Sequence, residues 1–249
     1  MANFIRSTQP TLSLREKYLS SLAEPQEWFL EELIEQGQVW THPDGSYAIT
    51  QDKTLLEFFS AEPSLMKERL SAFHNQNGVA KALVKSYDHG LVQACQQLGW
   101  TSAIGGLLFR AREKGRTVTF ENAQMRVATL GDKFAIWRIN DGFFESEVEL
   151  ASLLRAHKIW VVIVEGEVAG FGLAQLVLET GNAVDIGMLV APNMRRKGLG
   201  TFIICELANM LEQRGMRAIC GCGVSNIASR KTLENAGFVS NHQLLAFTP

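Results

Sequence analysis

Two pairs of segments in this 249-residue chain repeat the same pattern, and this repetition limits what the chain can fold into. Residues 28–40 and 145–160 each read as an amphipathic helix that runs into a strand ending in tryptophan. Residues 88–100 and 226–238 have equal length, and each segment ends in glycine followed by an aromatic residue. Chance similarity between two mixed segments is the alternative interpretation. A real repeat predicts two related α/β units.

The offsets between the paired segments show where the two halves differ. The first pair is offset by 120 residues and the second by 138, so the second half carries 18 extra residues between its paired segments. A polar stretch at 111–124 joins the halves, and we expect one domain over 1–121 and another over 122–249. Alternating strands and helices predict an α/β (α+β) fold, with a mixed sheet that carries helices on both faces.

Composition excludes several classes of protein. Hydrophobic residues make up 46% of the chain and charged residues 20%, which predicts a folded core. The 24 Lys and Arg residues against 26 Asp and Glu give a net charge of −2, which argues against nucleic acid or an anionic membrane as the partner. No apolar run reaches the ~20 residues that a membrane-spanning helix needs.

The cysteines indicate the compartment. The N-terminus lacks the basic start and apolar core of a secretory signal, so we expect a cytoplasmic protein whose cysteines are free thiols. Cys220 and Cys222 have the spacing of one face of a strand, with no second Cys/His pair nearby, and we expect no metal site.

A basic loop that contains glycine lies between a predicted strand and a predicted helix. Residues 184–190 are a β-branched and apolar run, and residues 201–213 have helical periodicity. The sequence RRKGLG lies between them at 195–200. Backbone N–H groups and the dipole at a helix N-terminus attract anions, and glycines let a phosphate approach the main chain. The loop matches neither GxxxxGK[ST] nor GxGxxG, and a structural turn is the alternative interpretation.

A second motif about 30 residues later makes the chain resemble the GNAT superfamily of acyl-CoA-dependent N-acyltransferases. The family's pyrophosphate loop, [RQ]-x-x-G-x-[GA], is matched by Arg195, Gly198 and Gly200. Its N-x-x-[SA] motif and the following helix that ends in Gly-Phe are matched by Asn226, Ser229, Gly237 and Phe238. The resemblance covers 125–249. The first half has AEPSL at 61–65 in place of the loop and resembles a degenerate copy of the same unit.

The resemblance implies a mostly antiparallel sheet whose central strands splay apart in the second unit, with acetyl-CoA as the cosubstrate. Pantetheine would pair with the exposed strand backbone, and loop amides would hold the pyrophosphate. The cofactor-binding residues that it implies are Met188, Leu189, Val190, Arg195, Arg196, Lys197, Gly198, Leu199, Gly200, Thr201, Asn226 and Ser229. A neutral amine would attack the thioester directly, with the N–H of Leu189 as the expected oxyanion donor.

Catalytic side chains are less well specified by the resemblance. Asp185 lies about where some family members keep a carboxylate base, although an exposed strand residue or a salt-bridge partner is the alternative. Leu233 stands where the family often has a tyrosine acid, and leucine cannot donate a proton. Unaided departure of the thiolate, a water molecule, Cys220, Cys222 or His242 remain as alternatives for this step.

Phe143, Phe144 and Glu145 are candidates for the wall that contacts the acceptor. The two aromatic residues could line an apolar pocket or close the domain core. For the acidic residues of this segment, Ser146 followed by Glu149 indicates a helix capping box, a purely structural alternative.

Together these features predict an N-acetyltransferase that moves an acetyl group from acetyl-CoA to a primary amine of a small molecule or a polypeptide. The sequence does not identify the acceptor. A non-catalytic acyl-CoA-binding or protein-interaction module is the alternative, because Leu233 replaces the usual acid and the first half lacks a phosphate loop. That first half could serve as an acceptor wall, as scaffold or as the surface of a possible homodimer.

Overall fold

The computed structural model describes residues 3–7 and 12–249, and the chain divides into two compact units. Unit 1 comprises Met1–Leu108 and Asn241–Pro249, and unit 2 comprises Phe109–Ser240. Within the described residues, no helix has both the length and the apolar character needed to cross a membrane.

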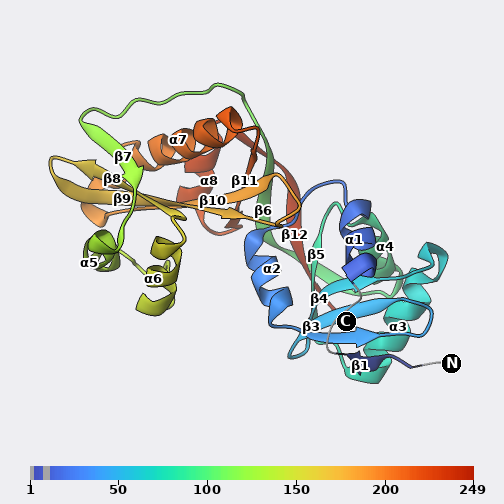
Figure 1. Cartoon of the computed structure of the whole chain (residues 1–249). Helices are drawn as coiled ribbons and strands as arrows, with labels where there is room; N and C mark the ends of the chain where they lie inside the picture. Colours follow the sequence, from blue (N-terminus) through green and yellow to red (C-terminus); the bar gives the residue numbers. More distant parts are fainter. Residues whose placement is uncertain (1–2, 8–11) are drawn as a thin grey trace. The chain divides into compact units, whose positions relative to one another are not determined.

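The elements of the first half follow the order strand, two helices, three strands, helix, strand, helix, strand (Figure 1). They are β1 (Ile5–Ser7), α1 (Leu12–Ser21), α2 (Trp28–Glu35), β2 (Gln38–Thr41), β3 (Tyr47–Gln51), β4 (Thr54–Phe59), the 3-10 helix η1 (Pro63–Leu65), α3 (Met66–Asn77), β5 (Lys81–Lys85), α4 (His89–Gln97) and β6 (Thr101–Arg112).

The second half repeats this order. Its elements are β7 (Ala123–Val127), η2 (Leu130–Asp132), α5 (Lys133–Arg138), α6 (Glu147–Arg155), β8 (Ile159–Val164), β9 (Glu167–Leu176), β10 (Ala183–Val190), η3 (Pro192–Met194), α7 (Leu199–Gln213), β11 (Arg217–Gly223), α8 (Ile227–Asn235) and β12 (Phe238–Thr248). The predicted boundary at 121/122 falls in the connection between β6 and β7 and stays a prediction.

The backbone at the start of α4 and α8 agrees with the repeat at a matched position. Asp88 has φ −83° and ψ 72°, and Asn226 has φ −83° and ψ 73°. Each side chain accepts a hydrogen bond from the amide three residues later, Leu91 at 3.2 Å and Ser229 at 3.0 Å. The two positions are 138 residues apart, which is the offset that the paired segments predict.

Strand pairing is mostly antiparallel, as predicted. The strand order is β1-β2-β3-β4-β5 in unit 1 and β11-β10-β9-β8-β7 in unit 2. β4 and β5 run parallel, as do β10 and β11, whereas β1 to β4 and β7 to β10 pair with their neighbours antiparallel.

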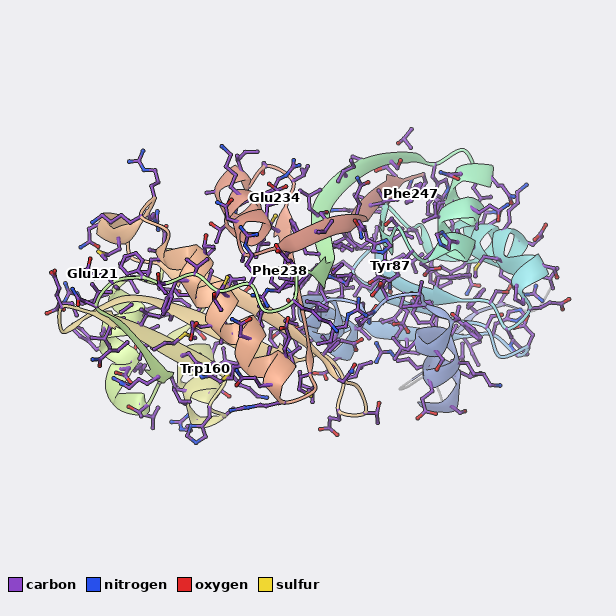
Figure 2. All side chains as sticks on the ribbon, turned by 90° about the horizontal axis from the view of Figure 1, so that it is seen from above. Tyr87, Glu121, Trp160, Glu234, Phe238 and Phe247 are labelled. Atoms are coloured by element: carbon purple, nitrogen blue, oxygen red, sulfur yellow. The ribbon has the colours of Figure 1, made fainter. Side chains whose placement is uncertain are left out.

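The last strand of each half begins in one unit and ends in the other. β12 starts in unit 2 at Phe238, and its residues 244–247 pair antiparallel with 82–85 of β5 in unit 1. Figure 2 labels Phe238 and Phe247 at the two ends of this strand. Phe247 is buried in the core of unit 1, so the first half of the sequence alone lacks part of that core.

Helix α7 covers one face of the unit 2 sheet, and α5 and α6 cover the other (Figure 1). Two glycines of β9 allow α7 and β10 to approach closely. A Cβ added at Gly172 would lie 2.6 Å from a methyl carbon of Leu207, and one at Gly170 would lie 2.8 Å from the carbonyl oxygen of Leu189. Both positions therefore require glycine for space.

Unit 1 buries a group of charged side chains around Glu57, which is fully buried on β4. The Glu57 carboxylate accepts hydrogen bonds from Arg15 at 3.2 Å and from the Tyr47 hydroxyl at 2.6 Å. Arg15 also forms an ion pair with Glu31 at 2.7 Å. Burial and the Glu57 carboxylate raise the pKa of Tyr47, which keeps its hydroxyl protonated as a donor.

A second buried group continues from the first. Gln26 donates to Glu31, and its side-chain oxygen accepts from Lys85 at 2.8 Å. Lys85 also donates to the Tyr18 hydroxyl at 2.7 Å, and Tyr18 donates to Asp88 at 2.8 Å. Burial, followed by the Asp88 carboxylate, raises the pKa of Tyr18. This network adds polar contacts to the apolar clusters that hold α1 and α2 against the sheet.

The buried Cys95 predicts a loss of stability at alkaline pH. Burial, assisted by the Asp88 carboxylate, raises the pKa of this thiol from 9.0 to about 12. Because the thiol ionises first in the unfolded chain, its contribution is complete below pH 9 and falls as pH rises towards 12. At 1.36 kcal/mol per pH unit, the loss at pH 10.5 is about 2 kcal/mol. Urea midpoints at pH 8 and pH 10.5 should therefore differ more for the wild type than for Cys95→Ala. Equal differences in the two proteins would contradict the raised pKa of Cys95.

Candidate functional site

The parallel strands β10 and β11 part after three residues. Residues 183–185 of β10 pair with 217–219 of β11, whereas β10 continues to Val190 paired with β9. The predicted splay of the central strands in unit 2 is confirmed. Among the described pairings, residues 186–190 of β10 therefore have a strand partner only on the side of β9.

The direction of the backbone groups alternates along β10. The Ala183 carbonyl accepts from the amide of Val177, and the Ala191 amide donates to the carbonyl of Ala169. The backbone N–H and C=O groups of odd-numbered residues therefore point towards β9. The carbonyl of Asn182 accepts from the amide of Arg217, so the backbone groups of even-numbered residues point towards β11. Because backbone groups alternate in a strand, the N–H and C=O of Met188 point into the splay.

The loop after β10 leads into α7 through two residues with positive φ. Arg196 has φ 61° and Gly198 has φ 91°, and Leu199 is the first residue of the helix. The first backbone bond of α7 runs from Phe202 N–H to the Gly198 carbonyl. Among the described residues, the N–H groups of 196–201 have no acceptor, and no side chain caps this helix.

The space in front of the loop is open. A Cβ added at Gly198 would meet no atom within 4 Å, and Arg196 and Lys197 are exposed. Six unpaired N–H groups, the positive end of a 15-residue helix dipole and two exposed cations together fit a phosphate or diphosphate group.

Arg195 has a different environment from its two basic neighbours. Its Nε donates to the Val190 carbonyl at 3.1 Å, and its Nη2 forms an ion pair with Asp141 at 2.6 Å. These contacts turn the guanidinium of Arg195 back towards the protein. The role of Arg195 in cofactor binding stays a prediction. Asp141 was not predicted as a site residue, and only the Asp-Gly turn signal at 141–142 marks this position.

Asn226 and Ser229 form the start of α8. The Asn226 side chain caps the helix by accepting from the Ser229 amide, so the observed role of this motif is structural. The predicted contact with pantetheine is an additional role that stays a prediction. Leu199 and Thr201 are buried in the first turn of α7, and Met188 lies against Gly200, with its sulfur 3.3 Å from a Cβ added there.

Asp185 is half-buried at the last β10 position that pairs with β11. Burial and the Asp185 charge raise the pKa of the buried Cys220 thiol well above its ordinary value. Burial also raises the pKa of Cys222. Both thiols therefore stay protonated near neutral pH. His242 lies in unit 1, with its ring 5.2 Å from that of Tyr87.

The two adjacent phenylalanines have different environments. Phe144 is buried in the core and stacks on Phe171 with ring centroids 5.2 Å apart. Phe143 is half-buried and lies over β10, since a Cβ added at Gly187 would be 3.4 Å from its Cζ. Glu145 is exposed, and the hydroxyl of Ser146 accepts from the Glu149 amide at 3.1 Å. The predicted cap of α6 is therefore present.

Within residues 3–7 and 12–249, no group of three His, Cys, Asp or Glu side chains is placed to hold a metal ion. Leu233, at the position where a tyrosine acid would stand, is buried in α8.

Comparison with known families decides the class of protein. Residues 129–238 match the Acetyltransferase (GNAT) family, and residues 7–112 match an Acetyltransferase (GNAT) domain. The chain belongs to the GNAT acetyltransferase family. It is a two-unit GNAT protein, in which the first half is also a recognisable GNAT unit.

Solved structures share this two-unit GNAT fold. An acetyltransferase of the GNAT family from Colwellia psychrerythraea is 18% identical, covers 100% of this chain and 99% of its own, and has a TM-score of 0.83. A tandem GNAT protein from the clavulanic acid biosynthesis pathway is 10% identical, covers 100% of this chain and 98% of its own, and has a TM-score of 0.65. At these identities the likeness shows the fold alone. Comparison of the sequence with curated proteins finds no match.

Proposed function

We propose that this GNAT protein transfers an acetyl group from acetyl-CoA to a primary amine, and that unit 2 holds acetyl-CoA. The observation that carries the proposal is the uncapped N-terminus of α7 beside the splayed edge of β10. The first offers donors for a diphosphate, and the second offers a strand edge for the amides of pantetheine.

The residues present fit both parts of the ligand. The N–H groups of 196–201, with Arg196 and Lys197, would hold the diphosphate. Backbone groups of even-numbered residues on β10 would pair with pantetheine. When bound, acetyl-CoA supplies the activated acyl group, and the chain's own residues bind and orient it.

The strand alternation bears on which amide contacts the acyl oxygen. The N–H of Leu189 is the predicted donor, but odd-numbered residues of β10 face β9. The N–H of Met188 faces the splay, which favours Met188 for this role. The strand fixes the Met188 amide in place, so it would act as a donor that needs no reorganisation.

Asp185 is the proposed general base for the attacking amine. Side chains alternate along a strand, so Asp185 shares a face of β10 with Gly187, the residue that Phe143 covers. If Asp185 takes the proton, Asp185→Asn should lower kcat by about 100-fold and change the pH–rate profile. Glu167→Gln, an exposed acid-to-amide control on β9, should leave both unchanged. An unaltered profile in Asp185→Asn would remove it as the base.

The proposed function is tested by release of free thiol from acetyl-CoA in the presence of a panel of small-molecule and peptide amines. We expect amine-dependent thiol release by the full chain. Tight CoA binding with no turnover on any amine would instead support the acyl-CoA-binding module, for which the buried Leu233 is the favouring observation. Absence of both binding and turnover would overturn the proposal.

A further inference from the structure

Arg195 joins three segments of unit 2. Its backbone belongs to the phosphate loop, its Nε holds the carbonyl of Val190 at the end of β10, and its Nη2 holds the carboxylate of Asp141. The Arg195–Asp141 pair spans 54 residues of sequence, and its N–O distance is 2.6 Å.

Asp141 belongs to a tightly braced turn at residues 140–144. The side chain of Asn140 accepts from the Phe144 amide at 2.7 Å and donates to the Phe144 carbonyl at 2.9 Å. The Asn140 carbonyl accepts from the Phe143 amide at 2.9 Å. Asp141 has φ 46° and Gly142 has φ 76°, so the chain passes through two consecutive residues in the left-handed region.

This 140–144 turn determines where the Phe143 ring lies. The ring packs perpendicular to Phe171, with centroids 5.1 Å apart, and it lies over Gly187 of β10. Gly187 is next to Met188, whose backbone faces the splay. An unbroken series of contacts therefore leads from the phosphate loop through Arg195 and Asp141 to the aromatic ring above β10.

We propose that Asp141 is a positioning residue that couples occupancy of the phosphate loop to the 140–144 turn. The inference rests on the proposed function, because it takes the loop to be the diphosphate site. A diphosphate bound to 196–201 restricts the backbone of the loop and thereby the guanidinium of Arg195. The ion pair then restricts the turn and holds Phe143 in place over β10. The acceptor side of the site is thus ordered by filling the cofactor side.

The exposure of the pair indicates where its effect should be seen. The side chains of Arg195 and Asp141 are 43% and 60% exposed, and ion pairs at this exposure add little to global stability. The coupling should therefore appear in local opening of the turn. The Phe143 and Phe144 amides report that opening, since both are hydrogen-bonded to Asn140 and exchange only when the turn opens.

The test is amide hydrogen exchange of the full chain with and without saturating CoA, for the wild type, Asp141→Asn and Asp141→Gly. Asparagine and glycine both accept a positive φ, so both variants retain the turn. In the wild type, CoA should slow exchange of the Phe143 and Phe144 amides by at least about fivefold, the lower end of typical coupling between sites. In both variants the slowing at these amides should fall below about twofold, while protection at 196–201 persists.

Glu147→Gln is the matched control, because it removes a surface ion pair to Lys133 at 2.6 Å that does not involve the loop. It should keep the wild-type response. CoA protection at 196–201 with no response at Phe143 and Phe144, or with an equal response in the Asp141 variants, would overturn the coupling and leave the proposed function intact. No protection at 196–201 in any protein would overturn both.

Discussion

Gly198→Val should weaken CoA binding by at least about 100-fold, roughly 2.8 kcal/mol, while the chain remains folded. Gly198 has φ 91°, a conformation that valine adopts only with strain, and its added side chain would fill the open space in front of the loop. Both effects displace a phosphate from the N–H groups of 196–201. Titration calorimetry with CoA measures the loss.

Gly215→Val provides the matched control for this prediction. Gly215 also has a positive φ, 70°, and a Cβ added there also meets nothing within 4 Å, but it follows the C-terminal end of α7. The two variants should lose similar stability, about 1–2 kcal/mol for a left-handed backbone, and only Gly198→Val should lose CoA binding. Equal CoA affinity in the two variants would show that the loop is not the phosphate site.

Arg15→Ala should destabilise unit 1 by about 3–5 kcal/mol, the cost of breaking a buried ion pair. The substitution leaves Glu57 fully buried, with a hydrogen bond from the Tyr47 hydroxyl but without its cationic partner, and it also removes the cationic partner of Glu31. Urea unfolding followed by far-UV circular dichroism measures the change. Addition of Glu57→Gln to Arg15→Ala should restore part of the loss, because it removes the uncompensated charge.

Arg230→Ala is the control for an arginine whose ion pair lies at the surface. Arg230 pairs with Glu234 one turn along α8, with both side chains about half exposed, and this substitution should leave the urea midpoint almost unchanged. If Arg15→Ala cost no more than Arg230→Ala, the buried network would not help to hold α1 and α2.

The elements around the phosphate loop could be predicted from local sequence. The apolar run at 184–190 coincides with β10, and the periodic segment at 201–213 lies within α7. The helix begins two residues earlier, at Leu199, because Gly198 turns the chain into it with a positive φ. The splay followed from the family resemblance, since no local pattern shows where β10 and β11 part.

The missing phosphate loop of unit 1 was also visible in the sequence. Unit 1 has the same splay, because among the described pairings β4 meets β5 only at residues 54–55 and 81–82. Its 3-10 helix η1 leads directly into α3, without the basic glycine loop. Glu62 precedes η1, and a carboxylate at this position repels phosphate.

Contacts between distant segments could not be predicted from the chain alone. Arg15, Glu31 and Glu57 read as ordinary surface charges, and only the packing of α1 and α2 brings them together. The pairing of Arg195 with Asp141 depends in the same way on where β10 ends relative to the 140–144 turn. Which of Met188 and Leu189 faces the splay depends on strand register, which a shift of one residue reverses.

We propose that the backbone amides of 196–201 in unit 2 bind the diphosphate of CoA and that unit 1 has no equivalent site. The most direct measurement is a CoA titration of the full chain followed by amide chemical shifts. Large shifts should appear at 196–201 and at the even-numbered residues of 186–190, with none at 62–68 of unit 1. Shifts centred on 62–68, or saturation without shifts at 196–201, would contradict the claim.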